Sequence, residues 1–261
     1  MRTRLALAAT AALTLAAGAV WAARTAGAAS SAPVYVSAAL ANPNRGDDPG
    51  LDAKRKPLEV VSFTGVRPGA KVADLIPGHG YWSIIFSDVV GPKGHVYLVW
   101  PKEYESDDKQ DVVSTGELVK KPGFGNMSVL HETAAAFSAP EKLDLVFTAQ
   151  NYHDYPDKFM GPTDPMLLNR AVYRALKPGG VFIVVDHAAQ PGSGMRDTET
   201  LHRIDGAIVK KQVTAAGFEF VGESNALRNP ADDHKLLVFK KEIRGHTDQF
   251  IYKFRKPLKA K

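Results

Sequence analysis

The chain has 261 residues, of which 44% are hydrophobic and 23% are charged, and this mixture excludes collagen-like, coiled-coil and disordered proteins. The formal net charge is +5, but Arg2, Arg4 and Arg24 lie in the acid-free residues 1–28; subtracting these three from 33 bases leaves 30 against 28 acids, or +2. No cluster of Lys or Arg suggests a nucleic-acid surface, so we expect no nucleic-acid partner. The chain contains no cysteine, which excludes disulfides, thiol nucleophiles and thiolate metal sites.

Residues 1–28 have the pattern of a secretory signal peptide. A short basic segment, residues 1–4, precedes the apolar residues 5–20, and Ala26 and Ala28 place small side chains where signal peptidase reads them. An uncleaved membrane anchor is the alternative, but this Ala-rich stretch is short for a span that needs about 20 residues. Without a cysteine, a lipoprotein anchor is excluded. We expect cleavage near Ala28, a periplasmic bacterial protein and no stable membrane insertion afterwards.

The rest of the chain alternates between two periodicities. Residues 29–50 are rich in Ala, Pro and Gly and predict an irregular arm ahead of one domain over residues 51–261. Short apolar runs predict buried strands at residues 71–76, 95–100, 127–130, 143–148 and 181–185. Helical patterns cover residues 52–63, 81–90, 164–176 and 201–216, and turns are predicted at 66–69 and 177–180. Strands alternating with helices predict an α/β fold with a mostly parallel sheet.

The end of the chain departs from this alternation. Residues 218–223 and 250–255 both read as strands, and the last one is expected to run antiparallel to its neighbours. The residues between them are too many for a tight hairpin, and structureless loops beyond roughly 12–15 residues are uncommon unless they are functional. We expect this polar segment to close over a substrate, with Arg228 and His234 orienting it. A solvated surface loop is the alternative.

A glycine-rich turn follows the first predicted strand. Residues 72–82 (VADLIPGHGYW) resemble the first motif of class I S-adenosylmethionine (SAM)-dependent methyltransferases. Glycine lets the backbone approach a cofactor closely, and the helix N-terminus behind the turn favours negative charge. A dinucleotide site would have a third glycine where Ser83 stands. The resemblance implies that Asp74, Gly78 and Gly80 belong to a SAM site.

Other segments match the same family in the same order. Residues 142–146 (KLDLV) resemble its fourth strand, and residues 176–183 (LKPGGVFI) its helix–turn–strand before strand five. Segments 151–154, 202–205 and 228–234 are similar to a group of exported, predicted methyltransferases of bacteria. The resemblance implies a Rossmann-like, doubly wound, seven-stranded sheet, SAM as cofactor, and methyl transfer to a small molecule or an envelope component. It also implies that Glu132 faces the adenine and that Asn151 contacts the cofactor.

The sequence departs from the family at two positions. Ile76 stands where members usually have the first glycine of the turn. Strand two is expected to end in an acid that binds the ribose hydroxyls, but Trp100 and Pro101 follow here, and Glu103 is the nearest substitute. These departures leave a second hypothesis open, a catalytically inactive methyltransferase fold that binds a periplasmic ligand. A hydrolase is disfavoured because no Gly-x-Ser-x-Gly motif occurs.

Polar residues follow the fourth and fifth predicted strands, where open α/β sheets bind ligands. Methyl transfer depends on alignment, and a base helps when the acceptor carries a proton. His153, beside Asp154, is the first candidate base because imidazole titrates near neutral pH, and His187 is the second. The alternative is that His153 and Asp154 only cap a loop.

A metal site is a further alternative at the same strand ends. Asp154 with Asp186 and His187 loosely resembles the Mg²⁺ ligands of catechol-type methyltransferases, although histidine and carboxylate together suit Mn²⁺, Zn²⁺ or Fe²⁺ better. The sequence contains neither HExxH nor a close pair of histidines. We therefore expect no metal site.

Overall fold

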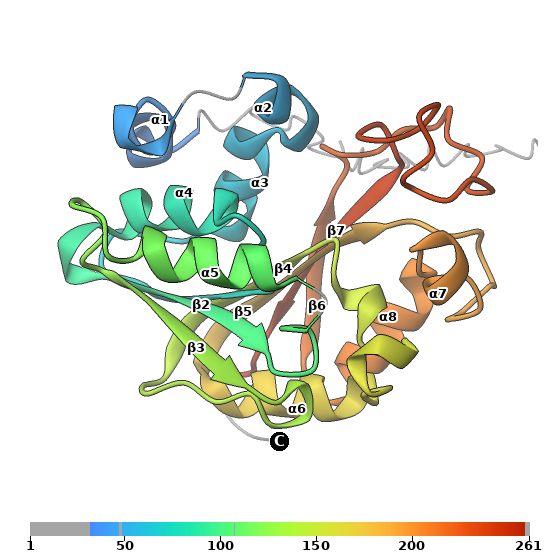
Figure 1. Ribbon diagram of the computed structural model, residues 1–261. Helices are drawn as coiled ribbons and strands as arrows, with labels where there is room; N and C mark the ends of the chain where they lie inside the picture. The colour runs from blue at the N-terminus through green and yellow to red at the C-terminus, as the bar shows by residue number, and fades with distance from the viewer. Residues whose placement is uncertain (1–31, 47–48, 107, 259–261) are drawn as a thin grey trace, which may run out of the picture. The chain divides into compact units, whose positions relative to one another are not determined.

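The computed structural model describes residues 32–46, 49–106 and 108–258. The predicted signal peptide and its cleavage site lie outside these residues. Residues 32–261 form one compact unit around a central sheet (Figure 1). None of the helices in the described ranges is long and apolar enough to cross a membrane.

Seven strands form the sheet, in the order β3-β2-β1-β4-β5-β7-β6. Their bounds are β1 Lys71–Leu75, β2 His95–Pro101, β3 Met127–Glu132, β4 Leu143–Ala149, β5 Leu176–His187, β6 Glu219–Ser224 and β7 Gln249–Arg255. The first five strands pair in parallel, and β7 lies antiparallel between β5 and β6. The predicted fold, a doubly wound sheet with an antiparallel last strand, is confirmed.

Helices cover both faces of the sheet. Their bounds are α1 Val34–Leu40, α2 Pro49–Arg55, α3 Pro57–Thr64, α4 Tyr81–Val90, α5 Lys109–Leu118, α6 Pro165–Ala175, α7 Thr198–Leu201 and α8 Gly206–Ala215. Figure 1 shows α4 and α5 on one face and α6 and α8 on the other. Short 3-10 turns are η1 Pro43–Arg45, η2 Gly91–Lys93, η3 Ala134–Ala136, η4 Tyr152–Asp154 and η5 Lys158–Met160. Val146 and Phe147, adjacent on β4, belong to two different core clusters, as expected of a strand buried on both faces.

The N-terminal region is more ordered than the irregular arm that its composition predicts. Helix α1 buries Val36 in the core on the α4 face of the sheet. Arg45 pairs with Asp52 of α2, and the same carboxylate accepts a hydrogen bond from the Tyr81 hydroxyl at 2.6 Å. Tertiary contacts of this kind stabilise helices whose own periodicity is weak.

Two helices predicted as continuous are each broken. The helix predicted at residues 52–63 is interrupted at Lys56 (φ 44°), because the residue before Pro57 is disfavoured in the helical region. The helix predicted at 201–216 is interrupted after α7, and it resumes where the Asp205 side chain accepts a hydrogen bond from the backbone of α8. At this second break, His202 has a φ of 51° and Arg203 is fully buried.

The turn predicted at residues 177–180 is instead the irregular beginning of β5. Gly179 has a φ of 81°, and the register against β4 shifts between Leu143 and Leu145. Regular pairing of β5 with β4 therefore begins at Val181, opposite Leu145.

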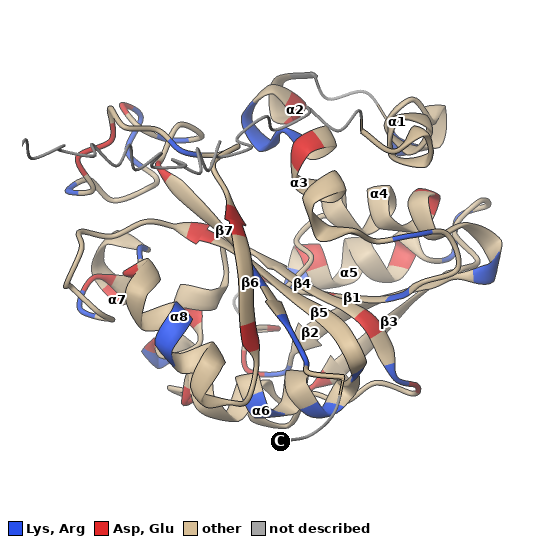
Figure 2. Cartoon of the chain, turned by 180° about the vertical axis from the view of Figure 1, so that it is seen from behind, with Lys and Arg blue, Asp and Glu red and all other residues tan. Residues whose placement is uncertain are grey.

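Residues 225–248, between β6 and β7, are called the lid segment below. The structure describes all of these residues, and it shows turns and neither helix nor strand among them. Figure 2 shows charges of both signs along this segment. It begins after the end of β6 and returns at the start of β7, so both of its ends lie at the edge of the sheet where the parallel strands end.

Candidate functional site

The glycine turn, residues 76–80, joins β1 to α4. Ile76, Gly78 and Gly80 all have positive φ, at 53°, 56° and 86°. The Ile76 N–H donates to the Val99 carbonyl at 2.9 Å, and the Asn151 side-chain amide donates to the Ile76 carbonyl at 2.8 Å. Hydrogen bonds with β2 and with the loop after β4 therefore hold Ile76 in a conformation that usually favours glycine.

The two glycines of the turn are needed for different reasons. At Gly80 the φ of 86° favours glycine, and an added Cβ would also lie 2.6 Å from Leu118 Cδ2 on α5. A Cβ on Gly78 would meet only Asp111 Oδ2, at 3.7 Å, so it would extend into open space. Helix α4 begins at Gly80 without a side-chain cap, and its first N–H groups favour an anion. A Cβ at Gly78 would occupy an open cradle between the turn and Asp111 that a bound cofactor can otherwise fill.

Asp74 lies beneath the turn. Its side chain is 1% exposed, and its Oδ2 accepts a hydrogen bond from the Ser83 hydroxyl at 2.6 Å. Burial raises the pKa of Asp74 to about 7, although the Ser83 hydrogen bond and the Arg55 charge oppose the shift. Asp74 therefore fastens β1 to α4 and shapes the turn from below.

The position expected to hold a ribose acid is occupied by apolar structure. Trp100 is fully buried, and its ring N–H donates to the Thr115 hydroxyl at 2.9 Å. Glu103 Oε2 accepts from the Ala134 N–H at 3.0 Å and so is already engaged. Trp100 has no carboxylate, and that of Glu103 is bound to the backbone of η3, so neither residue supplies the expected ribose acid.

Asp111, in the first turn of α5, does lie beside Gly78. Its Oδ1 is 2.6 Å from His79 Nδ1, within the glycine turn itself. Burial raises the pKa of Asp111, as does nearby Asp108, whereas His79 opposes the shift. The sequence analysis missed Asp111 because it searched only the end of β2.

Glu132 ends β3, the edge strand that β2 separates from β1. Its Oε1 accepts from the Ser138 hydroxyl at 3.3 Å. Among the predicted cofactor residues, Asp74, Gly78, Gly80 and Asn151 therefore gather at the turn, while Glu132 lies two strands away.

A second polar group, called the histidine cluster, lies past the ends of β4 and β5. It consists of His153, Asp154, Asp186 and His202. His153 Nδ1 is 2.7 Å from Asp186 Oδ1, and its Nε2 is 3.1 Å from Asp154 Oδ1 and 3.3 Å from His202 Nδ1. Burial lowers the pKa of His153, but Asp186 and Asp154 outweigh burial and hold that pKa well above its usual value. His153 is 2% exposed, so this predicted base is enclosed by its partners.

His187 is the predicted base that reaches a cavity. It lies at the end of β5, and its Nδ1 is 2.7 Å from the Thr247 hydroxyl of the lid segment. Burial lowers the pKa of His187 well below its usual value, and the positive charges of His153 and Arg203 lower it further. The imidazole is therefore neutral at pH 7, with one ring nitrogen unprotonated.

The lid segment is fastened to the sheet by a buried ion pair. Arg203 Nη1 and Nη2 donate to the two oxygens of Asp232 at 2.8 and 3.1 Å. Arg228 and His234, the predicted substrate residues, both contact Asp248 Oδ2, at 2.9 and 3.0 Å. These two side chains therefore brace the lid segment internally.

A cavity of about 290 Å³ lies between α2, the ends of β4 and β5, and the lid segment. Residues that line it include Arg55, Gln150, His187, Val238, Phe239 and Arg244. Lys54 adds a third cation, and no Asp or Glu is among the described lining residues.

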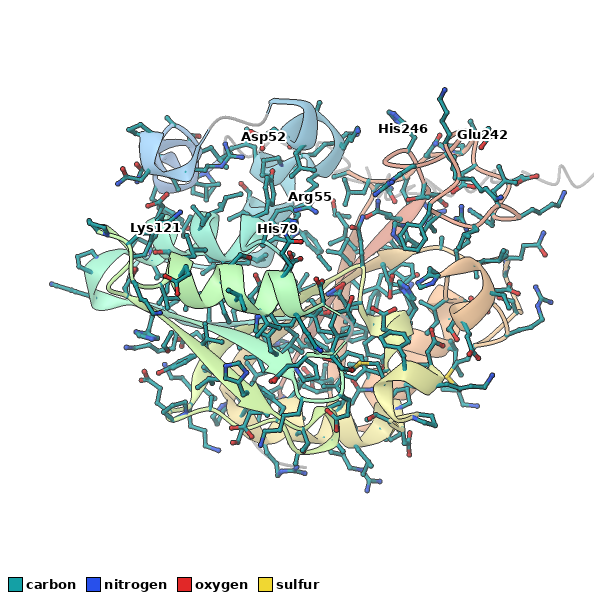
Figure 3. All side chains as sticks on the ribbon, viewed as in Figure 1. Asp52, Arg55, His79, Lys121, Glu242 and His246 are labelled. Carbon is teal, nitrogen blue, oxygen red and sulfur yellow. The ribbon has the colours of Figure 1, made fainter. Side chains whose placement is uncertain are left out.

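The cavity adjoins the glycine turn. The Arg55 guanidinium lies 4.5 Å from the centre of the Tyr81 ring, and its charge acts on Asp74 beneath the turn; Figure 3 labels Arg55 and His79. Gln150 precedes Asn151, which binds the turn directly. The sequence analysis missed Arg55 and Phe239 because neither belongs to a motif, and only the fold places them together.

Comparisons with known proteins agree with this arrangement. A model of the ubiE/COQ5 methyltransferase family matches residues 52–198. The chain is 31% identical over 191 residues to the ubiquinone/menaquinone biosynthesis C-methyltransferase UbiE of Shewanella sp. (strain ANA-3), covering 71% of this chain and 69% of that protein.

Solved structures show the same fold. A SAM-dependent methyltransferase from Aquifex aeolicus has a TM-score of 0.58 at 20% identity, covering 80% of this chain and 94% of its own. A glycopeptide N-methyltransferase, MtfA, complexed with SAM has a TM-score of 0.51 at 13% identity, covering 76% and 86%. The open cradle at Gly78 and the uncapped start of α4 fit SAM as the cofactor. The chain belongs to the ubiE/COQ5 methyltransferase family and is a SAM-dependent methyltransferase.

Proposed function

We propose that the methyl acceptor is a small molecule with an acidic group, and that it binds in the cavity beside Arg55, His187 and Phe239. The observation that carries this proposal is the lining of the cavity, in which three cations and apolar side chains occur without a described acid. A volume of about 290 Å³ suits a small molecule better than a larger envelope component. The family assignment favours this enzyme over an inactive ligand-binding protein.

Different side chains of the cavity would bind the acceptor and take up its proton. SAM, when bound, supplies an electrophilic methyl group on a positively charged sulfur. Arg55 and Arg244 would hold the acidic group of the acceptor, because guanidinium ions bind carboxylates in a fixed geometry. Phe239 offers an apolar face. His187, with Nδ1 held by Thr247, would accept the acceptor's proton at Nε2.

Asp111 would take the place of the missing ribose acid. Its carboxylate lies beside Gly78, where a cofactor approaching the turn would meet it. In this arrangement α5, and not the end of β2, supplies the acid. Trp100 then belongs to the core beneath α5, where it binds Thr115.

We also infer that the protein is exported and acts in the periplasm. The basic residues 1–4, the apolar residues 5–20 and the small residues Ala26 and Ala28 support this inference. Intact-mass measurement of periplasmic material should find a chain that begins near residue 29. A full-length mass in the membrane fraction would contradict export.

The acceptor proposal is tested by release of the demethylated cofactor from SAM in the presence of small phenolic carboxylic acids and their matched amides. Acids should be methylated and amides should not, because only the acids pair with the cations. His187→Asn should lower kcat by about 100-fold, the lower range for a lost general base, with SAM affinity retained. His246→Asn, an exposed histidine of the lid segment, is the matched control and should keep wild-type kcat.

Two results would contradict the proposal. Equal turnover of acids and amides would remove the role of the cations. A His187→Asn variant with wild-type kcat would show that no proton passes through this imidazole.

A further inference from the structure

We propose that His153 Nε2, Asp154 Oδ1 and His202 Nδ1 form a binding site for a divalent cation of the zinc class. These three atoms are separated by 3.1, 3.3 and 3.8 Å. Ligand atoms bound at 2.0–2.1 Å around a tetrahedral zinc ion lie about 3.3 Å apart. The ligand atoms therefore already have nearly the spacing that such an ion requires.

The surroundings of His153 match those of a metal-bound histidine. A ligating imidazole almost always donates its other ring N–H to a carboxylate or carbonyl, which fixes its orientation. His153 Nδ1 lies 2.7 Å from Asp186 Oδ1, and the His153 backbone N–H donates to Asp186 Oδ2 at 2.8 Å. Asp186 is fully buried and so holds the ring in place with Nε2 directed at Asp154 and His202.

A buried carboxylate oxygen supports the site independently. Asp157 is 3% exposed, and its Oδ1 accepts from the Thr198 hydroxyl at 2.6 Å. Its Oδ2 is buried and meets no hydrogen-bond donor in the described part of the chain. The charges of His153, Asp154 and His202 all act on this carboxyl group. A buried oxygen in this state would accept a hydrogen bond from a water molecule that the ion holds.

The local charge also favours a cation. Asp154, Asp157 and Asp186 are each at most 5% exposed, and burial together with the charge of His153 keeps the neighbouring His187 imidazole neutral. Arg203, the nearby buried cation, is engaged with Asp232. A divalent ion would neutralise the excess negative charge, and two nitrogens with one oxygen suit Zn²⁺ better than Mg²⁺.

The sequence analysis expected no metal because it found no close pair of histidines. His153 and His202 are 49 residues apart and meet only because the chain breaks between α7 and α8. The signal is therefore three-dimensional, and no spacing rule would have found it.

The test uses the chain from residue 29 onward, without a polyhistidine tag, after treatment with a chelator. Zn²⁺ alone is titrated by calorimetry, and Co²⁺ is titrated as a spectroscopic probe. We expect one ion per chain and the visible d–d bands of four-coordinate Co²⁺. His202→Asn should weaken Zn²⁺ binding by about 100-fold, and Asp157→Asn by about 10-fold, the range seen when ligands and their partners are lost.

His202 suits this test because it is only partly buried and its φ of 51° is one that asparagine tolerates, so the variant should fold. The matched control is His131→Asn, which removes an exposed histidine that also pairs with an acid, Glu105, at 2.7 Å. This control should bind Zn²⁺ as the wild type does. Failure of the wild type to bind, or equal affinity in the wild type and His202→Asn, would overturn the proposal, as would equal loss in both histidine variants.

Discussion

The glycine turn and the histidine cluster both contain buried carboxyl groups, but the pKa values of these groups shift in opposite directions. Asp74, under the glycine turn, has a hydroxyl as its hydrogen-bond partner, and burial raises its pKa to about 7. Burial also raises the pKa of Asp154, but His153 and His202 outweigh burial and hold that pKa below its usual value. The first region is thus assembled from neighbouring residues with little buried charge, and the second from distant residues with several paired charges.

The difference suggests separate roles. The residues of the turn are contiguous, and hydrogen bonds with Val99 and Asn151 hold its first residue in place, which suits a common cofactor. The histidine cluster depends on three segments, η4, β5 and the α7–α8 break, and the His202 ring also lies 4.8 Å from the Phe239 ring of the lid segment. Changes in any of these segments would alter the acceptor side while the cofactor side stays intact.

The largest expected effect concerns the pH dependence of Asp74. Between pH 4 and 7 the folded chain holds a proton at Asp74 that the unfolded chain has lost, so this group makes the free energy of unfolding fall as pH rises. A change in pKa from 3.8 to about 7 corresponds to about 4 kcal/mol. Asp74→Asn should therefore gain about 4 kcal/mol relative to wild type between pH 4 and pH 8 in urea unfolding.

Ser83→Ala sharpens the same experiment. Loss of the hydroxyl that favours the charged form should extend the fall in stability to higher pH. Parallel stability curves for wild type and Asp74→Asn would show that Asp74 is ionised in the folded chain, and the contrast between the two regions would disappear.

The next effect tests the paired charges of the acceptor side. Arg203→Met leaves Asp232 buried without its guanidinium, which should cost about 3 kcal/mol in the free energy of unfolding. Adding Asp232→Asn should restore part of that loss. SAM affinity should stay at the wild-type value because Arg203 fastens the lid segment and not the glycine turn. Unchanged stability in Arg203→Met would contradict the fastening role.

A smaller effect is expected from Asp111 on the cofactor side. Asp111→Asn keeps the shape but removes the charge, and it should raise the Kd for SAM by about 10-fold, equivalent to about 1.4 kcal/mol. Glu117→Gln, which removes an exposed acid of the same helix that pairs with Lys120, is the control and should bind SAM normally. If calorimetry finds the same SAM affinity for Asp111→Asn and the wild type, Asp111 does not bind the ribose.

The same contrast explains what could be predicted from the sequence. The strands, the strand direction and the glycine turn follow from local periodicity and a contiguous motif, and the structure has them. Helix α1 was missed because its stability comes from burying Val36 against other elements. The break at His202 was missed because the helical pattern continues through it.

The site was predictable only where residues adjoin a strand end. His153, Asp154 and His187 follow β4 or β5 and were found by that rule. Arg55, Asp111 and Phe239 lie on helices or in the lid segment, and their positions depend on how distant segments pack. Arg228 and His234 were chosen for their polarity, but the structure pairs both with Asp248, a partner that sequence alone does not indicate.

The most direct measurement titrates SAM into the chain from residue 29 onward and follows amide hydrogen exchange. We predict one bound SAM per chain, with protection of residues 76–83 and 109–115 and little change at residues 152–154. Gly78→Val should abolish both binding and protection, because its side chain fills the open cradle and strains a backbone with a φ of 56°. The matched control is Gly125→Val, at a glycine without a positive φ and with no atom within 4 Å of an added Cβ, and it should bind normally. The absence of SAM binding by the wild type, or protection that leaves the glycine turn unchanged, would contradict the account.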